Sequence, residues 1–515
     1  MENNNETAFV GAVNELESDK DAIILRDLER QYTLEQVNNL CDGLEKILLQ
    51  EKISLLALHA ENGPLWVVAD LVCQRMNICL VPLPTFFSPL QLQAVLGHCQ
   101  VEFLLTDNPE SLHALVERTD KLLEMKSALQ LCKVKEQFDV APSRPKNTGK
   151  ITFTSGSTGV AKGVCLSNEQ LLTQATALKE VVGLMSPRHL CLLPLSTLLE
   201  NVAGVYAPLL ARGEVILPTL SDMGYQGSRL VAPEKMLGLI QQIAPDTIIL
   251  IPELLKLLVT AAKTGWSVPE SFKFIAVGGS KVGKALLQEA WSYGLPVYEG
   301  YGLSECASVV SLNTPADRLD GSCGKPLPHV GLKVLDGEIV VTGNTMLGYM
   351  NNPETWYQAS IHTGDLGHQD EAGFVHLDGR KKNILISSYG RNISPEWPES
   401  ELLANPLLQD VVVFGDARPH CVALISCRDP QCQNELIQQW IDQVNGALPD
   451  YAQVKSWYRL PQVLAAHPGL LTQNGRPRRE EIARGFASEI DALYEINKSE
   501  TVTSDGVSTK KEVML

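Results

Sequence analysis

The amino-acid sequence predicts a layered α/β protein. Through about residue 375, short apolar runs alternate with segments whose apolar residues recur at helical spacing. The apolar runs lack the polar alternation of a half-exposed strand, which is typical of strands covered on both faces. With 515 residues, of which 44% are hydrophobic and 20% charged, the chain can bury a large core without disulfides or a structural metal.

The first predicted helix follows Thr33, which forms a capping-box pattern with Gln36. Apolar residues then recur at helical spacing as far as Leu48. Ser167 and Gln170 repeat the capping pattern, so we expect a second helix there. Buried strands are predicted for residues 53–58, 103–106, 247–251 and 274–277.

The pattern changes after residue 320, where short strands punctuated by glycine predict a small β-rich subdomain that includes a strand at 337–343. A second unit follows, with strands at 410–415 and 422–426 and a helix at 395–404. We therefore predict a large N-terminal α/β domain of several subdomains over residues 1–380 and a small C-terminal α+β domain over 381–496. Residues 497–515 are polar, and we expect a disordered tail.

The charge balance excludes some classes of partner. Lys and Arg total 43 and Asp and Glu total 60, a formal net charge of −17. This argues against nucleic-acid binding over a broad basic face and against docking on anionic lipid. The longest uncharged stretch, residues 76–101, contains three prolines and is a poor membrane span. The twelve cysteines form no C-x-x-C pair and the N-terminus lacks a signal-peptide pattern, so we expect reduced thiols and a cytoplasmic protein.

The most informative chemical segment is residues 151–165. A strand pattern leads into a loop of glycine and hydroxyl residues that ends at Lys162. Glycines let the backbone direct N–H groups at an anion, hydroxyls add donors, and lysine adds positive charge. The predicted polyphosphate cradle consists of Thr154, Ser155, Gly156, Ser157, Thr158, Gly159 and Lys162.

This segment is not a Walker A loop. Ala161 precedes the lysine and Gly163 follows it, where that motif requires Gly and then Ser or Thr. The alternative interpretation is a flexible surface loop, since Ser/Thr/Gly clusters are common in linkers.

The whole segment closely resembles the phosphate loop of the adenylate-forming (AMP-binding) superfamily, which includes acyl-CoA synthetases, peptide-synthetase adenylation domains and firefly luciferase. Further motifs of that superfamily occur downstream in the same order, and the last two are most like the long-chain acyl-CoA synthetase branch. The matching segments are Tyr301-Gly-Leu-Ser-Glu305, Gly337-Glu-Ile-Val-Val341, Thr363-Gly-Asp365, Gly379-Arg-Lys-Lys382 and Asn392-Ile-Ser-Pro-Glu396.

The resemblance implies roles for individual residues, although a lone Asp or Glu is more often a turn or surface residue. Glu305 would bind Mg²⁺, and the ring of Tyr301 would lie against adenine. Asp365 would accept both ribose hydroxyls, and Arg380 would contact ribose or phosphate. The other residues of the implied nucleotide and acyl site are Gly278, Gly279, Ser280, Gly302 and Ser304.

Two departures from the family pattern bear on activity. The aromatic residue and histidine that commonly shape the carboxylate site are replaced here by Ser196 and Thr197, followed by Glu200. The family's mobile lysine corresponds to Arg476, which keeps the charge but not the shape. Either Arg476 takes the catalytic role of that lysine, or the adenylation step is weak, or the segment is a basic surface loop.

The resemblance implies a two-step reaction that uses ATP, Mg²⁺ and coenzyme A, with Lys162, Glu305 and Arg476 as catalytic residues. A carboxylic acid, most simply a medium- or long-chain fatty acid, would become an acyl-adenylate and then an acyl-CoA. Between the two steps the mobile C-terminal domain would rotate about a hinge at Lys382. The alternatives are transfer to an acyl carrier protein or an amine, and an ATP-binding regulator with weak turnover. The sequence leaves the oligomeric state open.

Overall fold

The computed structural model describes residues 19–124, 128–135, 143–154, 162–389, 391–472 and 475–500. The chain divides into two compact units. The first unit comprises residues up to Thr363 together with Gly367–Leu377. The second unit comprises Gly364–Leu366 and the chain from Asp378 onward.

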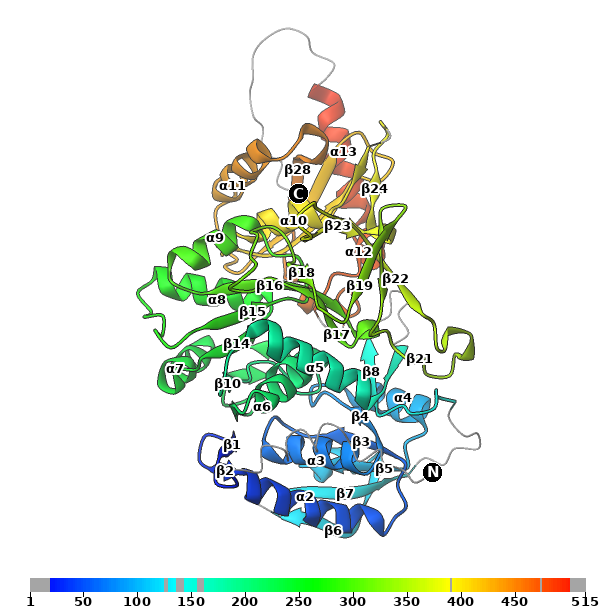
Figure 1. Cartoon of the computed structure of the whole chain (residues 1–515). Coiled ribbons are helices and arrows are strands. Elements are labelled where there is room, and N and C mark those ends of the chain that lie inside the picture. The colour runs from blue at the N-terminus through cyan, green and yellow to red at the C-terminus, as the bar shows by residue number, and fades with distance from the viewer. Residues whose placement is uncertain are drawn as a thin grey trace. The chain divides into compact units, whose positions relative to one another are not determined.

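Two large sheets form the centre of the first unit (Figure 1). The nine-stranded sheet has the spatial order β18 (Lys325–Pro326), β17 (Ser308–Leu312), β16 (Val297–Leu303), β15 (Phe274–Val277), β14 (Thr247–Leu250), β10 (Arg188–Leu190), β11 (Glu214–Ile216), β1 (Ile23–Arg26) and β2 (Gln31–Thr33). The eight-stranded sheet has the order β21 (Gly348–Tyr349), β9 (Lys162–Leu166), β8 (Lys150–Thr154), β4 (Cys79–Pro82), β3 (Leu55–His59), β5 (Phe103–Thr106), β7 (Ala128–Val134) and β6 (Val116–Glu124).

The strands in the middle of both sheets are parallel and buried. Strands β10, β14, β15 and β16 pair in parallel in one sheet, and β4, β3 and β5 do so in the other. Every residue of β3, β4 and β14 is buried, because helices cover both faces of a parallel sheet. Figure 1 shows α8 (Pro252–Lys263) and α9 (Lys284–Ser292) alongside β14 to β16. The predicted α/β class and the four predicted strands are confirmed, with ends shifted by up to two residues.

Both predicted capping boxes are present. Thr33 and Gln36 exchange side-chain and backbone hydrogen bonds at the start of α2 (Leu34–Leu49), and Ser167 and Gln170 do the same for α5 (Asn168–Val182). The other helices of the first unit are α3 (Pro64–Arg75), α4 (Pro89–Cys99), α6 (Ala207–Leu210) and α7 (Pro233–Ile243).

A smaller sheet accounts for the predicted β-rich region. Its order is β19 (Gly331–Leu335), β20 (Glu338–Thr342), β22 (Ser360–Gln369) and β23 (Val375–Arg380), and a separate hairpin consists of β12 (Tyr225–Gln226) and β13 (Arg229–Leu230). The predicted strand at 337–343 is β20.

The second unit is a small α+β fold around a three-stranded sheet. Strand β26 (Leu408–Phe414) is antiparallel to β27 (Cys421–Cys427), which is parallel to β28 (Val454–Arg459). The remaining elements are β24 (Leu385–Ile386), β25 (Asn392–Ile393), α10 (Glu396–Leu403), α11 (Asn434–Ala447), α12 (Arg479–Gly485) and α13 (Ala487–Glu500). The first four residues of the expected tail therefore belong to α13, and residues 501–515 lie outside the described residues.

A buried polar network lies inside the first unit. Lys150 on β8 and Asp70 on α3 form an ion pair of 2.8 Å, and each side chain is 1% exposed. Tyr206 donates its hydroxyl to Asp70 at 2.6 Å, and Asn201 donates its amide to the same carboxylate at 2.8 Å. Lys150 also donates to Tyr206 and Asn201. Burial lowers the pKa of Lys150 and the Asp70 carboxylate opposes that change, so the ion pair depends on its internal partners.

The network ends on a π-helix, η2 (Glu200–Tyr206), which carries both Asn201 and Tyr206. The first residue of the same turn, Glu200, reaches His189 on β10 of the other sheet. One short irregular helix is therefore bonded to both large sheets. Helices with this wide turn are rare and occur often at functional sites.

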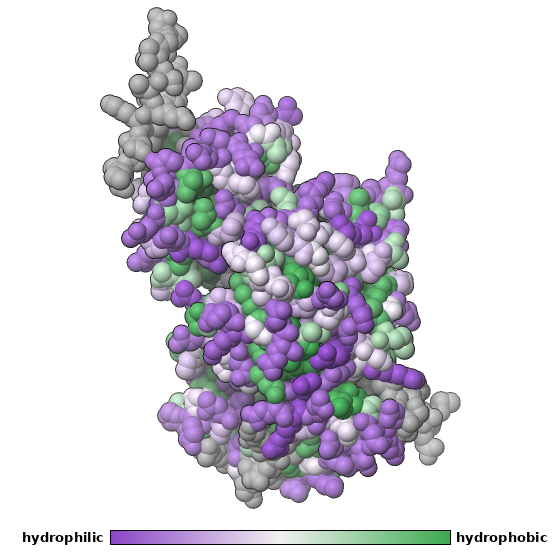
Figure 2. Space-filling model, turned by 90° about the vertical axis from the view of Figure 1, so that its left-hand side faces the viewer, coloured by the Kyte–Doolittle hydropathy of each residue, from purple (hydrophilic) through white to green (hydrophobic). Residues whose placement is uncertain are grey.

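The cysteines are buried, and the hydrophobic residues on the visible surface are dispersed. All twelve cysteines are buried, and none of them belongs to a disulfide. On the face shown in Figure 2, hydrophobic residues lie in separate small groups among hydrophilic ones. Among the described helices, none combines the length and the apolar composition that a membrane-spanning helix requires.

The buried network predicts a large effect of removing a single charge. The Asp70→Asn variant should lower the free energy of unfolding by about 3–5 kcal/mol, because Lys150 would stay buried without its counter-charge. The Asp70→Leu/Lys150→Met double variant should lose less than the single variant, since no uncompensated charge remains. Urea unfolding followed by circular dichroism measures both.

The exposed ion pair between Lys325 and Asp317, at 2.7 Å, supplies the control. The Asp317→Asn variant should cost no more than about 1 kcal/mol. If Asp70→Asn costs as little as Asp317→Asn, the network is not a determinant of stability.

Candidate functional site

The ends of the predicted phosphate loop lie opposite each other. Thr154 is the last residue of β8, Lys162 is the first of β9, and the two are partners in the antiparallel pair. The backbone thus forms the hairpin base that a phosphate cradle requires. The predicted residues Ser155, Gly156, Ser157, Thr158 and Gly159 lie outside the described residues, as does the side chain of Thr154.

Lys162 and Glu305, both predicted catalytic residues, meet at one tyrosine. The hydroxyl of Tyr349 donates to Oε1 of Glu305 at 2.8 Å, and Nζ of Lys162 lies 5.0 Å from the centre of the Tyr349 ring. That distance is within the range of a cation–π interaction. Burial, followed by the charge of Glu305, raises the pKa of Tyr349, so its hydroxyl keeps the proton that it donates.

Sequence reasoning missed Tyr349. It lies in Gly348-Tyr349-Met350, where a lone aromatic residue after glycine gives no chemical signal. Its position follows from the pairing of β21 with β9, in which it lies opposite Val164, a residue far earlier in the chain.

The turn that carries Glu305 is a single 3₁₀ turn, η3 (Ser304–Cys306), directly after β16. A Cβ at Gly302 would lie 1.7 Å from the carbonyl oxygen of Ser308, so only glycine fits there. After the turn, Ala307 and Ser308 have φ angles of 55° and 104°, which are strained for residues with a side chain. The backbone N–H of Met346 donates to the carbonyl of Glu305 at 2.7 Å and fixes the turn.

The glycines implied for the acyl site lie beside the nucleotide motif. A Cβ on Gly278 would lie 3.3 Å from the carbonyl oxygen of Gly300, so the two backbones approach closely. Gly279 and Ser280 are exposed, and Gly279 has a φ angle of 92°. Tyr301 is 8% exposed and belongs to the hydrophobic core. Its contact with adenine remains a prediction.

A buried carboxyl group, which sequence reasoning did not identify, holds the loop after these glycines. Glu299 on β16 is 6% exposed, and its Oε1 accepts the backbone N–H of Val282 at 3.3 Å. Burial raises the pKa of Glu299 to about 8, so this carboxyl group is largely protonated at neutral pH. A charged residue inside a buried strand was the signal available in the sequence.

In the second unit, Asp365 and Arg380 form an ion pair. Nε of Arg380 lies 2.7 Å from Oδ1 of Asp365, which is 6% exposed. The structure therefore brings together the two residues expected at the ribose.

The hinge motif, residues 379–382, packs on the segment 392–396. A Cβ on Gly379 would lie 2.1 Å from Oγ of Ser394, so a larger residue cannot stand there. Glu396 accepts hydrogen bonds from Ser394 at 2.9 Å and from Asn383 at 2.6 Å. Lys382 lies in the intervening 3₁₀ turn, η5 (Lys381–Asn383), and burial, reinforced by the charge of Arg380, lowers its pKa.

Arg476 is exposed, and its backbone is bonded to Thr472. The Thr472 N–H donates to the Arg476 carbonyl at 2.7 Å, and the Arg476 N–H donates to Oγ1 of Thr472 at 3.0 Å. Just after the loop, Arg479 binds both carboxylate oxygens of Glu399, at 2.8 and 3.0 Å. The bonds to Thr472 and the nearby ion pair of Arg479 therefore hold the backbone at Arg476.

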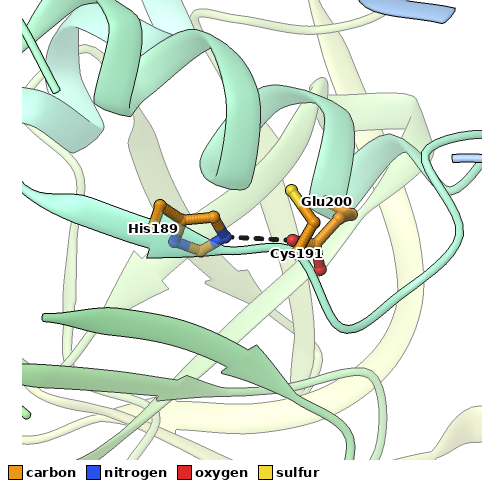
Figure 3. A group of neighbouring side chains, drawn as sticks. All are labelled: His189, Cys191 and Glu200. Atoms are coloured by element: carbon orange, nitrogen blue, oxygen red, sulfur yellow. Dashed lines mark hydrogen bonds and ion pairs between the residues drawn. The ribbon is translucent and has the colours of Figure 1, made fainter. Parts of the chain in front are cut away.

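A second cluster of potential metal ligands lies in the first unit, consisting of His189, Cys191 and Glu200 (Figure 3). Their ligand atoms lie within 4.8 Å of one another. However, Nε2 of His189 lies 3.0 Å from Oε1 of Glu200, and Nδ1 of His189 lies 2.8 Å from Oγ1 of Thr247. The backbone N–H of Leu193 donates to Oε2 of Glu200. Because the nitrogen and oxygen atoms already have protein partners, the cluster is a structural tie between β10 and the π-helix.

Comparison with known proteins identifies two families along the chain. The family described as "AMP-binding enzyme" matches residues 12–350, and "AMP-binding enzyme C-terminal domain" matches residues 382–498.

The individual proteins that resemble this chain share between a fifth and a third of its residues over the aligned segments. Long-chain-fatty-acid--CoA ligase FadD15 of Mycobacterium bovis is 33% identical over 247 residues, which cover 42% of this chain and 41% of that protein. The chain thus matches less than half the length of this relative. Long-chain-fatty-acid--CoA ligase 5 of Mus musculus is 25% identical over 85% of this chain and 80% of that protein. The Bacillus subtilis O-succinylbenzoate coenzyme A synthetase, solved with ATP and magnesium ion, has a TM-score of 0.73 at 22% identity, covering 92% of this chain and 98% of that one.

The carboxyl group of Glu299 predicts a pH-dependent stability. Its folded pKa of about 8 lies above the unfolded value of 4.5, so the folded state holds more protons between these values and loses stability as pH rises through them. The Glu299→Gln variant lacks this titration. Relative to wild type, its free energy of unfolding should increase by about 2–4 kcal/mol from acidic to mildly alkaline pH.

Chemical denaturation at several pH values measures the difference between the two proteins. Glu354→Gln, which removes an exposed carboxylate instead of a buried carboxyl group, is the control substitution. A constant difference for Glu299→Gln would show that this carboxyl group is not held protonated.

Proposed function

The chain belongs to the AMP-binding enzyme family, and from this premise we propose that it is an acid–thiol ligase that converts a carboxylic acid and coenzyme A to an acyl-CoA at the expense of ATP. The observation that carries the proposal is the grouping of Lys162, Tyr349 and Glu305 at the base of the phosphate-loop hairpin. A cation for phosphate oxygens and a carboxylate for a metal ion are the two charges that nucleotide activation requires.

In the first step a carboxylate oxygen of the acid attacks the α-phosphorus of ATP. The new C(O)–O–P bond forms while the bond between the α- and β-phosphates breaks, and pyrophosphate leaves. Lys162 and Arg476 would bind the phosphate oxygens on which charge accumulates. Asp365 would accept the ribose hydroxyls and so fix the nucleotide for in-line attack.

In the second step the coenzyme A sulfur attacks the carbonyl carbon of the acyl-adenylate. The thioester C–S bond forms, the C–O bond to AMP breaks, and the thiol proton goes to solvent. The hinge at Lys382 would allow the second unit to change position between the steps, because a few residues at the end of an element can absorb such a rotation.

The residues present fit a magnesium ion. Glu305 supplies a carboxylate, the hard oxygen ligand that Mg²⁺ prefers, and the hydrogen bond from Tyr349 engages one of its two oxygens. Bound there, Mg²⁺ would neutralise charge on the ATP phosphates.

A medium- or long-chain fatty acid is the proposed substrate. It rests on the names of the relatives, which are long-chain-fatty-acid--CoA ligases, and on the acyl-CoA synthetase pattern at the hinge. The similar solved structure is named for o-succinylbenzoate, an aromatic acid, so the experiment below includes that chemistry.

We expect ATP- and Mg²⁺-dependent pyrophosphate release that peaks with octanoate to palmitate and rises when coenzyme A is added. The assay panel runs from acetate to palmitate and includes benzoate and o-succinylbenzoate. Pyrophosphate release that does not change when coenzyme A is added would favour a carrier-protein thiol or an amine as acceptor. A peak with an aromatic acid would contradict the fatty-acid assignment.

Lys162→Ala and Glu305→Ala are the matched variants, and each should lower release by about 100-fold or more with an unchanged unfolding midpoint. ATP binding by the wild-type protein without release with any acid would contradict the ligase proposal and favour an ATP-binding regulator.

The Asp365→Ala variant tests the ribose assignment separately. It should weaken ATP affinity roughly tenfold, because two ribose hydroxyls lose a charged acceptor. Calorimetric titration with ATP measures this, and Asp317→Ala, which alters an exposed ion pair, is the control. An unchanged affinity would remove Asp365 from the nucleotide site.

A further inference from the structure

We propose that Tyr349 is a positioning residue that keeps the charges of Lys162 and Glu305 close together but unpaired, so that one can bind phosphate and the other Mg²⁺. This inference rests on the proposed function. It concerns a residue outside the motifs from which the site was predicted.

The contacts of Tyr349 divide between its two polar features. The hydroxyl donates to Oε1 of Glu305 at 2.8 Å, and the ring face lies 5.0 Å from Nζ of Lys162. Within the described part of the chain, Lys162 and Glu305 form no ion pair with each other, although both contact the same tyrosine. The tyrosine therefore acts as a spacer whose ring face attracts the ammonium group of Lys162 and whose hydroxyl binds the carboxylate of Glu305.

Strand pairing sets this position. Tyr349 on β21 is the partner of Val164 on β9. Side chains two residues apart on a strand share a face, so Lys162 lies on the same face as Val164 and is the diagonal neighbour of Tyr349. An aromatic ring is long enough to reach a diagonal neighbour.

The backbone of Tyr349 is held on both sides. Its N–H donates to Oγ1 of Thr355 at 3.0 Å, and its carbonyl accepts the indole N–H of Trp356 at 2.8 Å. The preceding Gly348 has a φ angle of 141°, and a Cβ there would lie 2.4 Å from Cδ1 of Trp356. Few backbone positions are therefore open to the tyrosine.

The chemical consequence concerns competition between charges. A lysine and a glutamate that could reach each other would pair directly, and each would then be less available to ATP or to a metal ion. The hydroxyl engages Oε1 alone, so Oε2 of Glu305 stays available to a metal ion. The tyrosine would thus preserve two opposite charges for two different ligands.

Calorimetric titration with ATP, in EDTA and in excess Mg²⁺, separates the two contacts without turnover. Tyr349→Phe loses the hydroxyl and keeps the ring, so its affinity in EDTA should equal that of wild type. The gain in affinity caused by Mg²⁺ should fall roughly tenfold, because the Glu305 carboxylate is no longer oriented. Tyr349→Leu should in addition weaken affinity in EDTA by about fivefold, because Lys162 loses the ring and can pair with Glu305.

The Tyr357→Phe variant is the matched control. Its hydroxyl accepts the N–H of Lys146 at 2.7 Å, with no contact to Lys162 or Glu305 among the described residues. It should bind ATP as wild type does in both buffers. Unfolding midpoints of all variants establish that they are folded, and Tyr349→Phe, the milder change, decides the result if Tyr349→Leu does not fold.

The outcomes separate this inference from the proposed function. If Glu305→Ala loses the Mg²⁺-dependent gain while Tyr349→Phe keeps it, the role of Tyr349 is overturned and the function stands. If the wild-type protein binds no ATP in either buffer, the proposed function fails and this inference fails with it.

Discussion

The buried ion pair between Lys150 and Asp70 is the interaction on which the architecture of the first unit depends. Two charges that are 1% exposed carry a large desolvation cost, and only a complete set of partners offsets it. Asn201 and Tyr206 supply those partners from the π-helix, so that helix cannot move without exposing unsatisfied charge. The other end of the π-helix is bonded to the nine-stranded sheet through Glu200 and His189. The two large sheets are thereby linked by polar bonds inside an apolar core.

The candidate site uses the relation between these two sheets. Lys162 begins a strand of the eight-stranded sheet, and Glu305 follows a strand of the nine-stranded sheet. Neither sheet alone carries both charges. Tyr349 belongs to the eight-stranded sheet, and its hydroxyl bonds to Glu305 in the turn that follows the nine-stranded sheet. The backbone N–H of Met346 fixes the same turn. A site assembled in this way inherits the rigidity of both sheets, which is what preorganised charges require.

Local signals in the sequence predicted much of this structure. The helices after Thr33 and Ser167 formed as expected because a capping box satisfies its own N–H groups and needs no distant partner. Strands with uninterrupted apolar runs also formed close to their predicted bounds. The proposed role of Tyr349 and the π-helix could not be predicted, because each depends on contacts with segments far away in the chain. Glu299 gave a signal, a charged residue inside a strand, but the burial that raises its pKa is known only from the fold. No property of residue 349 itself distinguishes it from an ordinary aromatic residue in a turn.

The arginine at position 476 shows how a local substitution depends on its support. A lysine ammonium is a compact charge that can approach two oxygens from many directions, whereas a guanidinium binds two oxygens only within its plane. The loop must therefore set the orientation of an arginine more strictly than that of a lysine. Its base is held by Thr472 and by the bidentate pair of Arg479 with Glu399, which lies on a helix of the same unit. The family pattern that this chain resembles has a lysine at this position, and the hydrogen bonds and the ion pair near Arg476 are the features that would fix the direction of an arginine there.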